Sequence, residues 1–435
     1  MTSQPSRRAF LGASAAALGT AALRPSADAT AQAPQDPVPP AIAALRPLRD
    51  RMVPITTAER LQRLERARAL MSEHRQDAIV LTGGTSLRYY TDIQWGLSER
   101  LLALVLPRSG RPFLVTPAFE RDRALEQVAD GPLAGTADVL TWEEHENTYA
   151  LVADGLRARG LGTGAVGIEE TVRWVFSDGI AAAMPAARLV SATPVTAGCR
   201  TIKSPAELAL MRLASEVTWR AYKAAYESLT DGMPQAEFGR LVSLAHQRQG
   251  FTGSAGVQVG KYSALPHGSR EPQVIREGSI LLIDGGCTVG GYQSDLSRTF
   301  VLGTPTDRMK QVFAVELEAQ TAALQAARPG VACEAVDAAA RAVIERAGFG
   351  TGYAYFTHRV GHGIGMDGHE WPYLVKGNTL PLAPGMTFSD EPGIYLPGEF
   401  GVRLEDDMVI TETGAELMSP QSPSLEAPFG VPFPG

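Results

Sequence analysis

Two aspartates, Asp284 and Asp295, lie in the glycine-rich stretch IDGGCTVGGYQSD and have the spacing of a possible metal-binding pair. The flanking segments SILLIDGGCTV and YQSDLSRTFVL have the composition of strands, and Gly290-Gly291 is typical of a two-residue hairpin turn. With that turn, Asp284 pairs with Ser297 and Asp295 with Gly286, so both carboxylates lie on one face. Two carboxylates so placed repel each other unless a cation or a proton lies between them. The hairpin is therefore either half of a metal site or a surface turn with an aspartate at each end.

Histidines supply a second group of candidate ligands. His267 lies in SALPHGS, and THRVGHGIGMDGHEW contains His358, His362 and His369. The glycines between these histidines predict an extended segment rather than a helix. HRVGH is therefore not the H-E-x-x-H helix of zincins, whose glutamate it also lacks. Capping of turns would explain any one of these histidines, but it explains the cluster poorly.

Two glutamates follow near the C-terminus. Glu391 precedes a Pro-Gly turn in FSDEPGIYLPG, and Glu405 lies in FGVRLEDDMVIT. The alternation of apolar and polar residues predicts that Glu405 lies in a central strand and that Arg403 shares its face. The alternative is a solvated strand face next to Asp406 and Asp407, which the apolar neighbours disfavour.

The candidate ligands have a composition that selects among metals. The set is Asp284, Asp295, His362, Glu391 and Glu405. Four carboxylates and one neutral imidazole balance two divalent cations. Oxygen-rich ligation without thiolate favours Mn(II), with Co(II), Fe(II) or Zn(II) as alternatives. Two such metals can share a water molecule, lower its pKa and polarise a carbonyl, so the chemistry expected is metal-assisted hydrolysis.

The elements that position these residues fall into two domains. Residues 53–195 predict an α/β domain, with a helix capped by Thr56 or Thr57, a strand at DAIVLTG, a hairpin turning at Ser109-Gly110, and strands at AVGIEE and ARLVSAT. Residues 196–435 predict an α+β domain with helices on a largely antiparallel sheet. Its first helix begins with a capping box at Ser204, Pro205 and Glu207, and two more helices are expected over about 307–327 and 332–347.

The composition is that of a globular protein. The chain has 435 residues, of which 44% are hydrophobic and 20% charged, with a net charge of -7. The scattered basic residues form no stripe, which argues against nucleic acid as a partner. The three cysteines, Cys199, Cys287 and Cys333, are far apart, so we expect buried free thiols rather than disulfides or a thiolate zinc site.

The N-terminus is typical of an export signal. Arg7 and Arg8 precede a short apolar run and the small-residue segment ADATAQA, so residues 1–31 predict a twin-arginine signal peptide. Residues 32–52 are proline-rich and predict a linker or arm. No later stretch is apolar enough to span a bilayer. We expect the mature protein to be periplasmic or secreted, without a membrane span.

Residues 196–420 resemble the catalytic domain of the pita-bread metallopeptidases, the group of methionine aminopeptidase, aminopeptidase P, prolidase and creatinase. The resemblance rests on DGG-x8-SD-x-SRTF, GHGIGMDGHE, EPGIY and GVRLED, which occur in that order. Residues 53–195 look like the creatinase-type N-terminal domain, through weaker motifs. The resemblance implies an α+β pita-bread domain behind a creatinase-type α/β domain, usually as a homodimer. It also implies a peptide substrate with proline after the scissile bond, cleaved by an Xaa-Pro dipeptidase or aminopeptidase.

The resemblance also implies a role for each site residue. Asp284 would bind one metal, His362 and Glu391 the other, and Asp295 and Glu405 would bridge them. Glu391 would in addition move the proton of the attacking water. The remaining roles fall on His267 and His369, which would hold or polarise substrate, and on His358 and Arg403, which would shape the pocket.

Two departures from the family pattern and several rival functions stay open. Ser297 stands where the family often has threonine, with little expected effect, and Asp390 adds a charge beside Glu391 that is expected to raise nearby pKa values or alter metal affinity.

One rival function is that of a metal-free creatinase-like amidinohydrolase, which would lack the five-ligand set. A second is a lyase such as the dimethylsulfoniopropionate lyases, and a third is a non-catalytic binding module that has lost the ligands.

Overall fold

The computed structural model describes residues 38–433. The predicted twin-arginine signal at residues 1–31 lies outside the described residues. The described part of the proline-rich arm contains a short helix, α1 (Pro40–Ala43), which contacts two helices of the C-terminal domain. Within residues 38–433 no helix combines the length and the hydropathy that a bilayer crossing requires.

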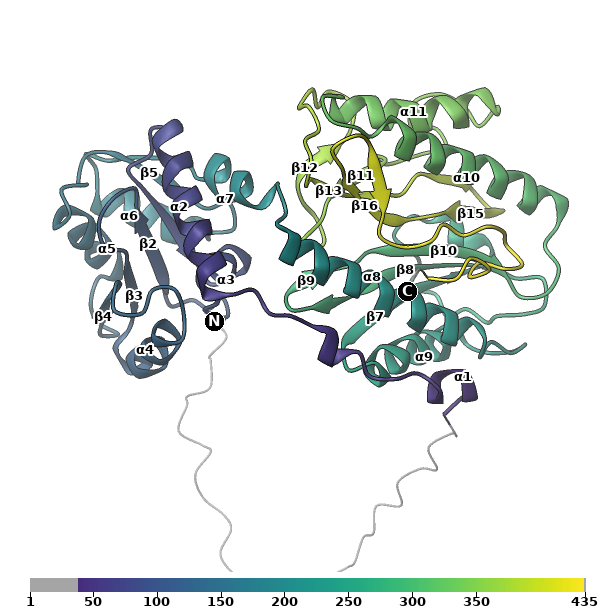
Figure 1. The fold of residues 1–435 in the computed structure, drawn as a ribbon, viewed down its shortest axis with the longest axis horizontal. Helices are drawn as coiled ribbons and strands as arrows, with labels where there is room; N and C mark the ends of the chain where they lie inside the picture. The colour runs from purple at the N-terminus through teal and green to yellow at the C-terminus, as the bar shows by residue number, and fades with distance from the viewer. Residues whose placement is uncertain (1–37, 434–435) are drawn as a thin grey trace, which may run out of the picture. The chain divides into compact units, whose positions relative to one another are not determined.

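The N-terminal domain is built on a six-stranded mixed sheet with the order β4-β3-β2-β1-β5-β6 (Figure 1). Strands β1, β2 and β3 form an antiparallel meander, and β4, β5 and β6 pair in parallel with their neighbours. The predicted hairpin joins β2 to β3, and Gly110 in its turn has φ +92°. The strands are β1 (Ala78–Thr82), β2 (Ala103–Pro107), β3 (Phe113–Pro117), β4 (Asp138–Trp142), β5 (Ala165–Ile168) and β6 (Arg188–Ser191).

Helices cover both faces of this sheet because successive residues of its central strands point to opposite sides. Ile79 and Leu81 of β1 belong to one apolar core, and Ala78 and Val80 to another. Residues of α2, α3 and α7 fill the first core, and residues of α5 and α6 fill the second. The helices are α2 (Thr57–Glu73), α3 (Thr85–Thr91), α4 (Arg121–Ala129), α5 (Thr148–Arg157), α6 (Trp174–Ala183) and α7 (Thr193–Arg200).

The C-terminal domain packs two pairs of helices on antiparallel sheets, which confirms the α+β prediction (Figure 1). One sheet has the order β10-β8-β7, with β9 paired to β8; a second has the order β12-β11-β13-β16-β17; and β14 pairs with β15. The helices are α8 (Pro205–Tyr226), α9 (Gln235–Arg248), α10 (Asp307–Ala326) and α11 (Cys333–Arg346). The strands are β7 (Thr252–Val259), β8 (Ile280–Val289), β9 (Tyr292–Gln293), β10 (Leu296–Val301), β11 (Gly361–Gly363), β12 (Glu370–Leu374), β13 (Thr387–Asp390), β14 (Gly393–Leu396), β15 (Phe400–Arg403), β16 (Asp406–Ile410) and β17 (Ala415–Leu417).

The predicted helix starts are confirmed by their hydrogen bonds. Thr56 Oγ1 accepts the backbone N–H of Glu59 at 3.2 Å and caps α2. Ser204 and Glu207 form the reciprocal capping box of α8, with Pro205 in its first turn. Side-chain oxygens at these positions satisfy N–H groups that have no partner inside the helix. The three cysteines are buried and free, as expected.

The prediction that Glu405 lies inside a strand is wrong. Strand β15 ends at Arg403 and β16 begins at Asp406, and Glu405 between them makes only an isolated antiparallel bridge to Ser297. That bridge links two of the sheets, with Glu405 N donating to Ser297 O at 3.2 Å and Ser297 N to Glu405 O at 3.3 Å. The chain leaves one sheet here to join another, a change that the alternation of residue types does not reveal.

Candidate metal centre

Candidate ligands from distant segments of the C-terminal domain converge at one place, with Asp284 in β8, His362 in β11 and the other three between strands. Two groups of side chains bring their ligand atoms within 4.8 Å of one another, and Glu405 belongs to both groups. One group adds Asp284 and Asp295 to Glu405, and the other adds His362 and Glu391. Two adjacent clusters that share a carboxylate have the arrangement expected for two cations with a bridging ligand.

The hairpin of β8, β9 and β10 places both aspartates as the sequence predicts. Thr288 pairs with Gln293, and Asp284 pairs with Ser297, so the register is the same on both sides of the ladder's interruption at Asp295. Gly290 and Gly291 have φ values of +59° and +94°, which a tight hairpin turn of this type requires. At Gly286, a Cβ atom would lie 1.7 Å from the carbonyl oxygen of Ser294. Only glycine therefore lets the segment that carries Asp295 approach β8 so closely.

Two carboxyl groups of the site, those of Asp295 and Glu405, have raised pKa values. Burial raises the pKa of Asp295 to about 7, and the charge of Asp284 adds to the rise. Burial also raises the pKa of Glu405 well above its usual value, with repulsion from Asp295 and Glu391 as further causes. Such carboxyls cannot all ionise together without a compensating cation. The protein by itself therefore leaves a deficit of positive charge at this point.

His362 is oriented as a metal ligand would be. Its Nδ1 lies 3.1 Å from the carbonyl oxygen of Gly363, an arrangement in which Nδ1–H donates and Nε2 faces the carboxylates. Nε2 lies 3.3 Å from Glu391 Oε1. Although burial alone would raise the pKa of Glu391, the hydrogen bond and charge of His362 lower it to about 2. His362 and Glu391 thus form a close acid–base pair in the protein without metal.

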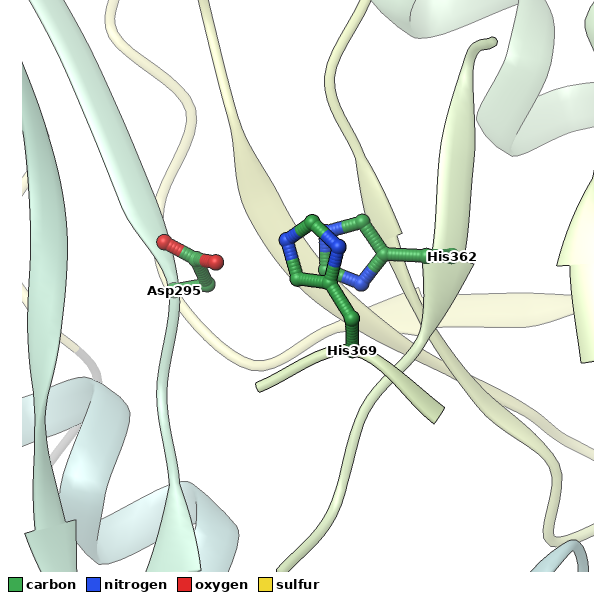
Figure 2. Close-up of side chains that lie close together, drawn as sticks. All are labelled: Asp295, His362 and His369. Carbon is green, nitrogen blue, oxygen red and sulfur yellow. The ribbon is translucent and has the colours of Figure 1, made fainter. Parts of the chain in front are cut away.

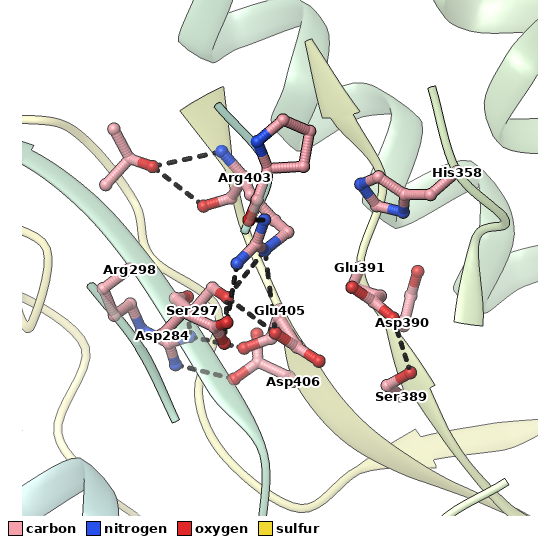
Figure 3. A network of polar contacts seen from close by, with 12 residues as sticks. Asp284, Ser297, Arg298, His358, Ser389, Asp390, Glu391, Arg403, Glu405 and Asp406 are labelled. Carbon is pink, nitrogen blue, oxygen red and sulfur yellow. Dashed lines mark hydrogen bonds and ion pairs between the residues drawn. The ribbon is translucent and has the colours of Figure 1, made fainter. Parts of the chain in front are cut away.

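Ser297 and Arg403 contact the carboxylates of the candidate ligands Asp284 and Glu405, as Figure 3 shows. The Ser297 hydroxyl lies 2.9 Å from Asp284 Oδ1 and 2.6 Å from Glu405 Oε2, and it accepts a hydrogen bond from Arg403 Nε at 2.9 Å. Arg403 Nη2 lies 2.8 Å from Asp284 Oδ2, and its side chain is buried. Serine at 297 therefore makes the contacts for which a hydroxyl is needed. Arg403 Nε also lies 3.9 Å from Glu405 Oε2, although the two residues do not share a strand.

A buried arginine fixes the bridge that carries Glu405. Arg298 Nη1 donates to the backbone carbonyls of Ser297 and Glu405 at 2.9 and 2.8 Å, and Nη2 pairs with Asp406 Oδ1 at 2.6 Å (Figure 3). The side chains of Arg298 and Asp406 are fully buried. This burial, shared by Asp407, excludes the solvated strand face considered for Glu405.

His358 and Arg403 meet through a tyrosine that sequence reasoning missed. Tyr395 lies in the EPGIY motif, and its hydroxyl is 2.7 Å from His358 Nε2 and 2.8 Å from Arg403 Nη1. Burial lowers the pKa of His358. The aromatic residue in the motif was a signal, but its partners lie in other parts of the chain.

His369 stacks on His362, with ring centroids 3.7 Å apart and planes 21° apart (Figure 2). Burial lowers the pKa of His369, and the positive charges of His362 and Arg359 contribute to the fall. Asp295, His362 and His369 also form a third group with metal-ligand spacing. The geometry therefore allows His369 either a role toward substrate or a place in the coordination shell.

All nine residues predicted for the site line one cavity of about 170 Å³. They are His267, Asp284, Asp295, His358, His362, His369, Glu391, Arg403 and Glu405. The cavity has two further lining residues, Pro266 and Arg359. Arg359 was missed because nothing in HRVGH distinguishes a pocket arginine from a surface one.

Asp390 behaves differently from the expectation for it. Its side chain is fully buried, and neither oxygen has a hydrogen-bond partner among the described residues. Burial raises the pKa of Asp390 itself well above its usual value, and the charge of Asp406 adds to this. The pKa of the neighbouring Glu391 is nevertheless lowered, so the rise expected there is not seen.

The donor set fits two divalent cations. The pKa values of Asp295 and Glu405 stay raised despite the nearby Arg403, the imidazole presents one nitrogen, and no thiol belongs to the described ligand groups. Oxygen-rich sites of this kind suit hard or borderline metals. The arrangement can hold two cations against a small substrate in a cavity of about 170 Å³.

Comparisons with known proteins cover both domains. Residues 63–202 match the creatinase/prolidase N-terminal domain, and residues 209–412 match metallopeptidase family M24. The Xaa-Pro dipeptidase of Lactobacillus helveticus is 31% identical over 359 residues, which are 81% of this chain and 95% of that protein.

Solved structures show the same likeness. The crystal structure of dipeptidase PepE from Mycobacterium ulcerans superposes with a TM-score of 0.80 and 35% identity, covering 86% of this chain and 99% of that one. The Xaa-Pro dipeptidase from Bacillus anthracis gives a TM-score of 0.72 and 28% identity, covering 82% and 97%. These likenesses extend over both domains rather than over the metal site alone.

Proposed function

Because the chain belongs to metallopeptidase family M24 and has a creatinase/prolidase N-terminal domain, we propose that it is a dinuclear-metal hydrolase that cleaves the peptide bond before proline. The fold that the resemblance implied, a pita-bread domain behind a creatinase-type domain, is confirmed. The observation that carries the proposal is the pair of ligand clusters that share Glu405 in one small cavity. The names of the relatives, Xaa-Pro dipeptidase and dipeptidase, support the choice of substrate.

We propose Mn(II) as the native metal, held by five residues. Asp284 would hold one ion, His362 and Glu391 the other, and Asp295 and Glu405 both. When bound, two such cations activate water and polarise a carbonyl oxygen. The four carboxylates balance the charge of two divalent ions, and the absence of thiolates disfavours softer metals.

The side chains around the ligands supply positioning and proton transfer. The Glu391 carboxylate lines the cavity and would take the proton of the attacking water and deliver it to the proline nitrogen, which becomes an amine as the bond breaks. His267 and His369 line the same cavity and would hold the substrate carbonyl. Tyr395 keeps His358 and Arg403 in place, and Arg403 neutralises part of the charge of Asp284.

One rival activity is separated from the proposal by an observation, and a second requires an experiment. A metal-free creatinase-like hydrolase has no need of five converging ligands, which this cavity contains. A lyase would use similar ligands, so product analysis must separate it from a peptidase. A peptidase releases the amino acid before proline together with proline or a peptide that begins with proline, and a lyase releases an alkene.

The experiment that tests the proposal compares matched peptides on metal-reconstituted protein. A bond to proline involves a tertiary amide without an N–H and with a rigid ring, which few sites accommodate. We expect hydrolysis of Xaa-Pro peptides and little hydrolysis of the matching Xaa-Ala peptides. A preference for Xaa-Ala, or no cleavage with Mn(II), Co(II), Fe(II) or Zn(II), contradicts the proposal.

We also propose export by the twin-arginine route, on the evidence of Arg7, Arg8 and the apolar run behind them. This route carries folded protein, so the metals can be loaded in the cytoplasm, away from the tighter-binding copper and zinc. Replacing Arg7 and Arg8 with lysine should leave active, metal-containing precursor in the cytoplasm. Continued export of the variant, or a metal-free cytoplasmic form, contradicts this proposal.

A further inference from the structure

Asp407 is a fully buried residue of β16 that contacts a metal-ligand segment without belonging to the ligand set. It is not among the residues that line the metal-site cavity or that form the three ligand groups. Its Oδ2 accepts a hydrogen bond from the backbone N–H of Asp295 at 3.0 Å. Asp407 also follows Glu405 by two residues in the chain. It therefore connects Asp295 and Glu405, the two residues that are proposed to bridge both metals.

The backbone N–H of Asp295 needs this acceptor because the hairpin ladder is interrupted there. Strand β9 ends two residues before Asp295, and β10 begins one residue after it. A backbone N–H that leaves a ladder inside a protein requires another partner. The partner comes from a different sheet, because β16 pairs with β13 and β17 whereas the hairpin is formed by β8, β9 and β10. The hydrogen bond thus ties one ligand-bearing segment to another.

Asp295 also borders two hollows, which limits how far packing can hold it. It lines the cavity of about 170 Å³ that contains the candidate ligands. It lines in addition a separate groove of about 580 Å³ along β7 and β8. A hollow beside a residue removes the close contacts that would otherwise fix its position. Hydrogen bonds to the segment therefore matter more here than they do in a filled core.

Helix α8 supports both partners of this contact. Ser215 Oγ lies 3.3 Å from Asp407 Oδ2, and Thr218 Oγ1 lies 2.9 Å from Oγ of Ser294, the residue before Asp295. Ser215 and Thr218 are three residues apart, so they project from the same side of the helix. Both are fully buried. One rigid helix thus holds the acceptor and the segment that carries the donor.

Asp390 offers a comparison within the same domain. It is also fully buried, and it directly precedes Glu391, another proposed ligand. Neither oxygen of Asp390 has a hydrogen-bond partner among the described residues, whereas Asp407 lacks one only at Oδ1. A buried carboxyl close in sequence to a ligand is therefore common to both residues. Of the two, only Asp407 holds the backbone of a second ligand.

We propose that Asp407 is a positioning residue that sets the separation of Asp295 and Glu405, and so allows both carboxylates to bridge two metal ions. The inference rests on the proposed function and adds a residue outside its ligand set. Replacing a residue that orients a metal ligand typically changes metal affinity by about 10- to 100-fold. A bridging carboxylate must reach two ions at once, so a displaced Asp295 should affect the pair of ions more than a single ion.

The test measures metal binding by the full-length protein, with Mn(II) alone as the probe. Asp407→Leu removes the acceptor at similar side-chain size and should weaken the binding of the second Mn(II) by about 10- to 100-fold in calorimetry. Asp407→Asn keeps a side-chain oxygen for the N–H of Asp295 and should bind both ions nearly as the parent does. An equal loss in the two variants would show that the charge of Asp407 matters and its hydrogen bond does not, which overturns the inference.

A spectroscopic readout separates positioning from a general loss of stability. Two Mn(II) ions that share bridging carboxylates are exchange-coupled, so their electron paramagnetic resonance spectrum differs from that of isolated Mn(II). The parent and Asp407→Asn should give the coupled spectrum, and Asp407→Leu should give that of isolated ions. Ser215→Ala removes the other contact of Asp407 Oδ2 and should weaken the second ion in the same direction but less. This variant tests the inference if Asp407→Leu does not fold.

Asp390→Leu is the matched control, because it makes the same substitution at a buried carboxyl that has no hydrogen bond to lose. It should keep both the coupled spectrum and the affinity of the parent for the second Mn(II). A loss as large as that of Asp407→Leu would mean that any buried carboxyl near the ligands has this effect, and the specific role of Asp407 would be overturned.

Failure of this inference and failure of the proposed function give different results. A coupled spectrum with parent-like affinity in Asp407→Leu overturns the role of Asp407 and leaves the dinuclear site intact. If the parent binds no pair of Mn(II) ions, the proposed function fails. Hydrogen exchange of the metal-free proteins then decides the role of Asp407: residues 292–297 should exchange more slowly in the parent than in Asp407→Leu, and equal exchange overturns it.

Discussion

Strands β1 and β16 are both completely buried, yet they bury opposite kinds of side chain. Strand β1 has the sequence AIVLT and lies between two apolar cores. Strand β16 has the sequence DDMVI, and its two aspartates directly follow Glu405 in the sequence. Burial of an apolar side chain contributes about 1.5–3 kcal/mol to stability, whereas burial of a carboxylate is costly unless it is paired.

The difference separates a region that stabilises the fold from a region that carries the candidate metal site. The N-terminal sheet is stabilised by the burial of apolar side chains. The C-terminal sheets hold a group of carboxyls whose negative charge is only partly balanced by basic side chains such as Arg298 and Arg403. The remaining deficit of positive charge is what the proposed cations would neutralise. Changes in the two regions should therefore have different consequences.

The largest effect is expected for Glu405→Gln, which removes one charge from the shared ligand without changing its size. At least one metal should be lost, and activity should fall by about 1,000-fold or more. The metal-free variant should be no less stable than the metal-free parent, because a buried repulsive carboxyl has been neutralised. Metal analysis, peptide hydrolysis and urea unfolding measure the three quantities. Two bound ions with near-normal turnover would show that Glu405 is not a ligand.

The stacked pair His362 and His369 comes next. His362→Ala should lose metal, because the Nε2 that faces Glu391 is removed. His369→Ala should retain both metals and lose rate, by about 100-fold, as expected of a group that acts on substrate. Metal content of the two variants, measured side by side, checks the assignment. If His369→Ala also loses an ion, then His369 belongs to the coordination shell with Asp295 and His362.

In the apolar region, Leu156→Ala should lower the stability of the fold without changing the metal content. Leu156 is a residue of α5 and is fully buried in the core that α5 and α6 form with the sheet. Its truncation should cost about 2–5 kcal/mol of unfolding free energy and leave metal content unchanged. Chemical denaturation and metal analysis give both values. A loss of metal as large as that of Glu405→Gln would mean that the two regions are not independent.

The contrast should also appear as a pH dependence of the metal-free protein. The pKa of Asp295 is raised to about 7, so the folded state holds this proton more tightly than the unfolded state does. Stability should therefore fall as pH rises from about 4 to about 7, by up to about 4 kcal/mol, and then level off. Glu391 raises the pKa of His362 despite its burial, and that stability is lost as pH rises above about 6.5, in the same direction.

Urea unfolding at pH 5 and pH 8, with a chelator and then with Mn(II), measures this dependence. Added metal should remove most of the loss at pH 8, because the cations replace the protons. A metal-free protein that is more stable at pH 8 than at pH 5 would contradict the described electrostatics.

The smallest effect is expected at the helix start capped by Thr56. Thr56→Ala removes the acceptor for the backbone N–H of Glu59 and should cost about 1 kcal/mol. Activity and metal content should not change, since α2 lies in the N-terminal domain. Thermal unfolding detects the shift, and Thr57→Ala, one residue along, serves as the control. Equal losses in both variants would mean that the cap does not depend on Thr56.

Local signals predicted the elements well because they act between residues close in sequence. The capping box of Ser204 and Glu207 and the turn at Gly290-Gly291 need only a few neighbouring residues to form. The turn in turn fixes the register of the hairpin, and therefore the common face of Asp284 and Asp295. The types of the candidate ligands were also readable, since four carboxylates and one imidazole have a definite preference among metals.

The sequence by itself determined the ligand types, the hairpin register and the helix starts of this protein, and the tertiary structure decided which side chains meet. The bridge between Ser297 and Glu405 joins residues far apart in the chain, and alternation could not show that Glu405 leaves its strand there. Tyr395 acquires its role from His358 and Arg403, which lie on different elements. Folding pairs Arg403 and Arg341 with aspartates but brings no acidic partner among the described residues to Arg359, a difference that the sequence does not show. These contacts depend on packing between sheets, which no local pattern encodes, because a side chain's charge and burial follow from the whole set of its neighbours.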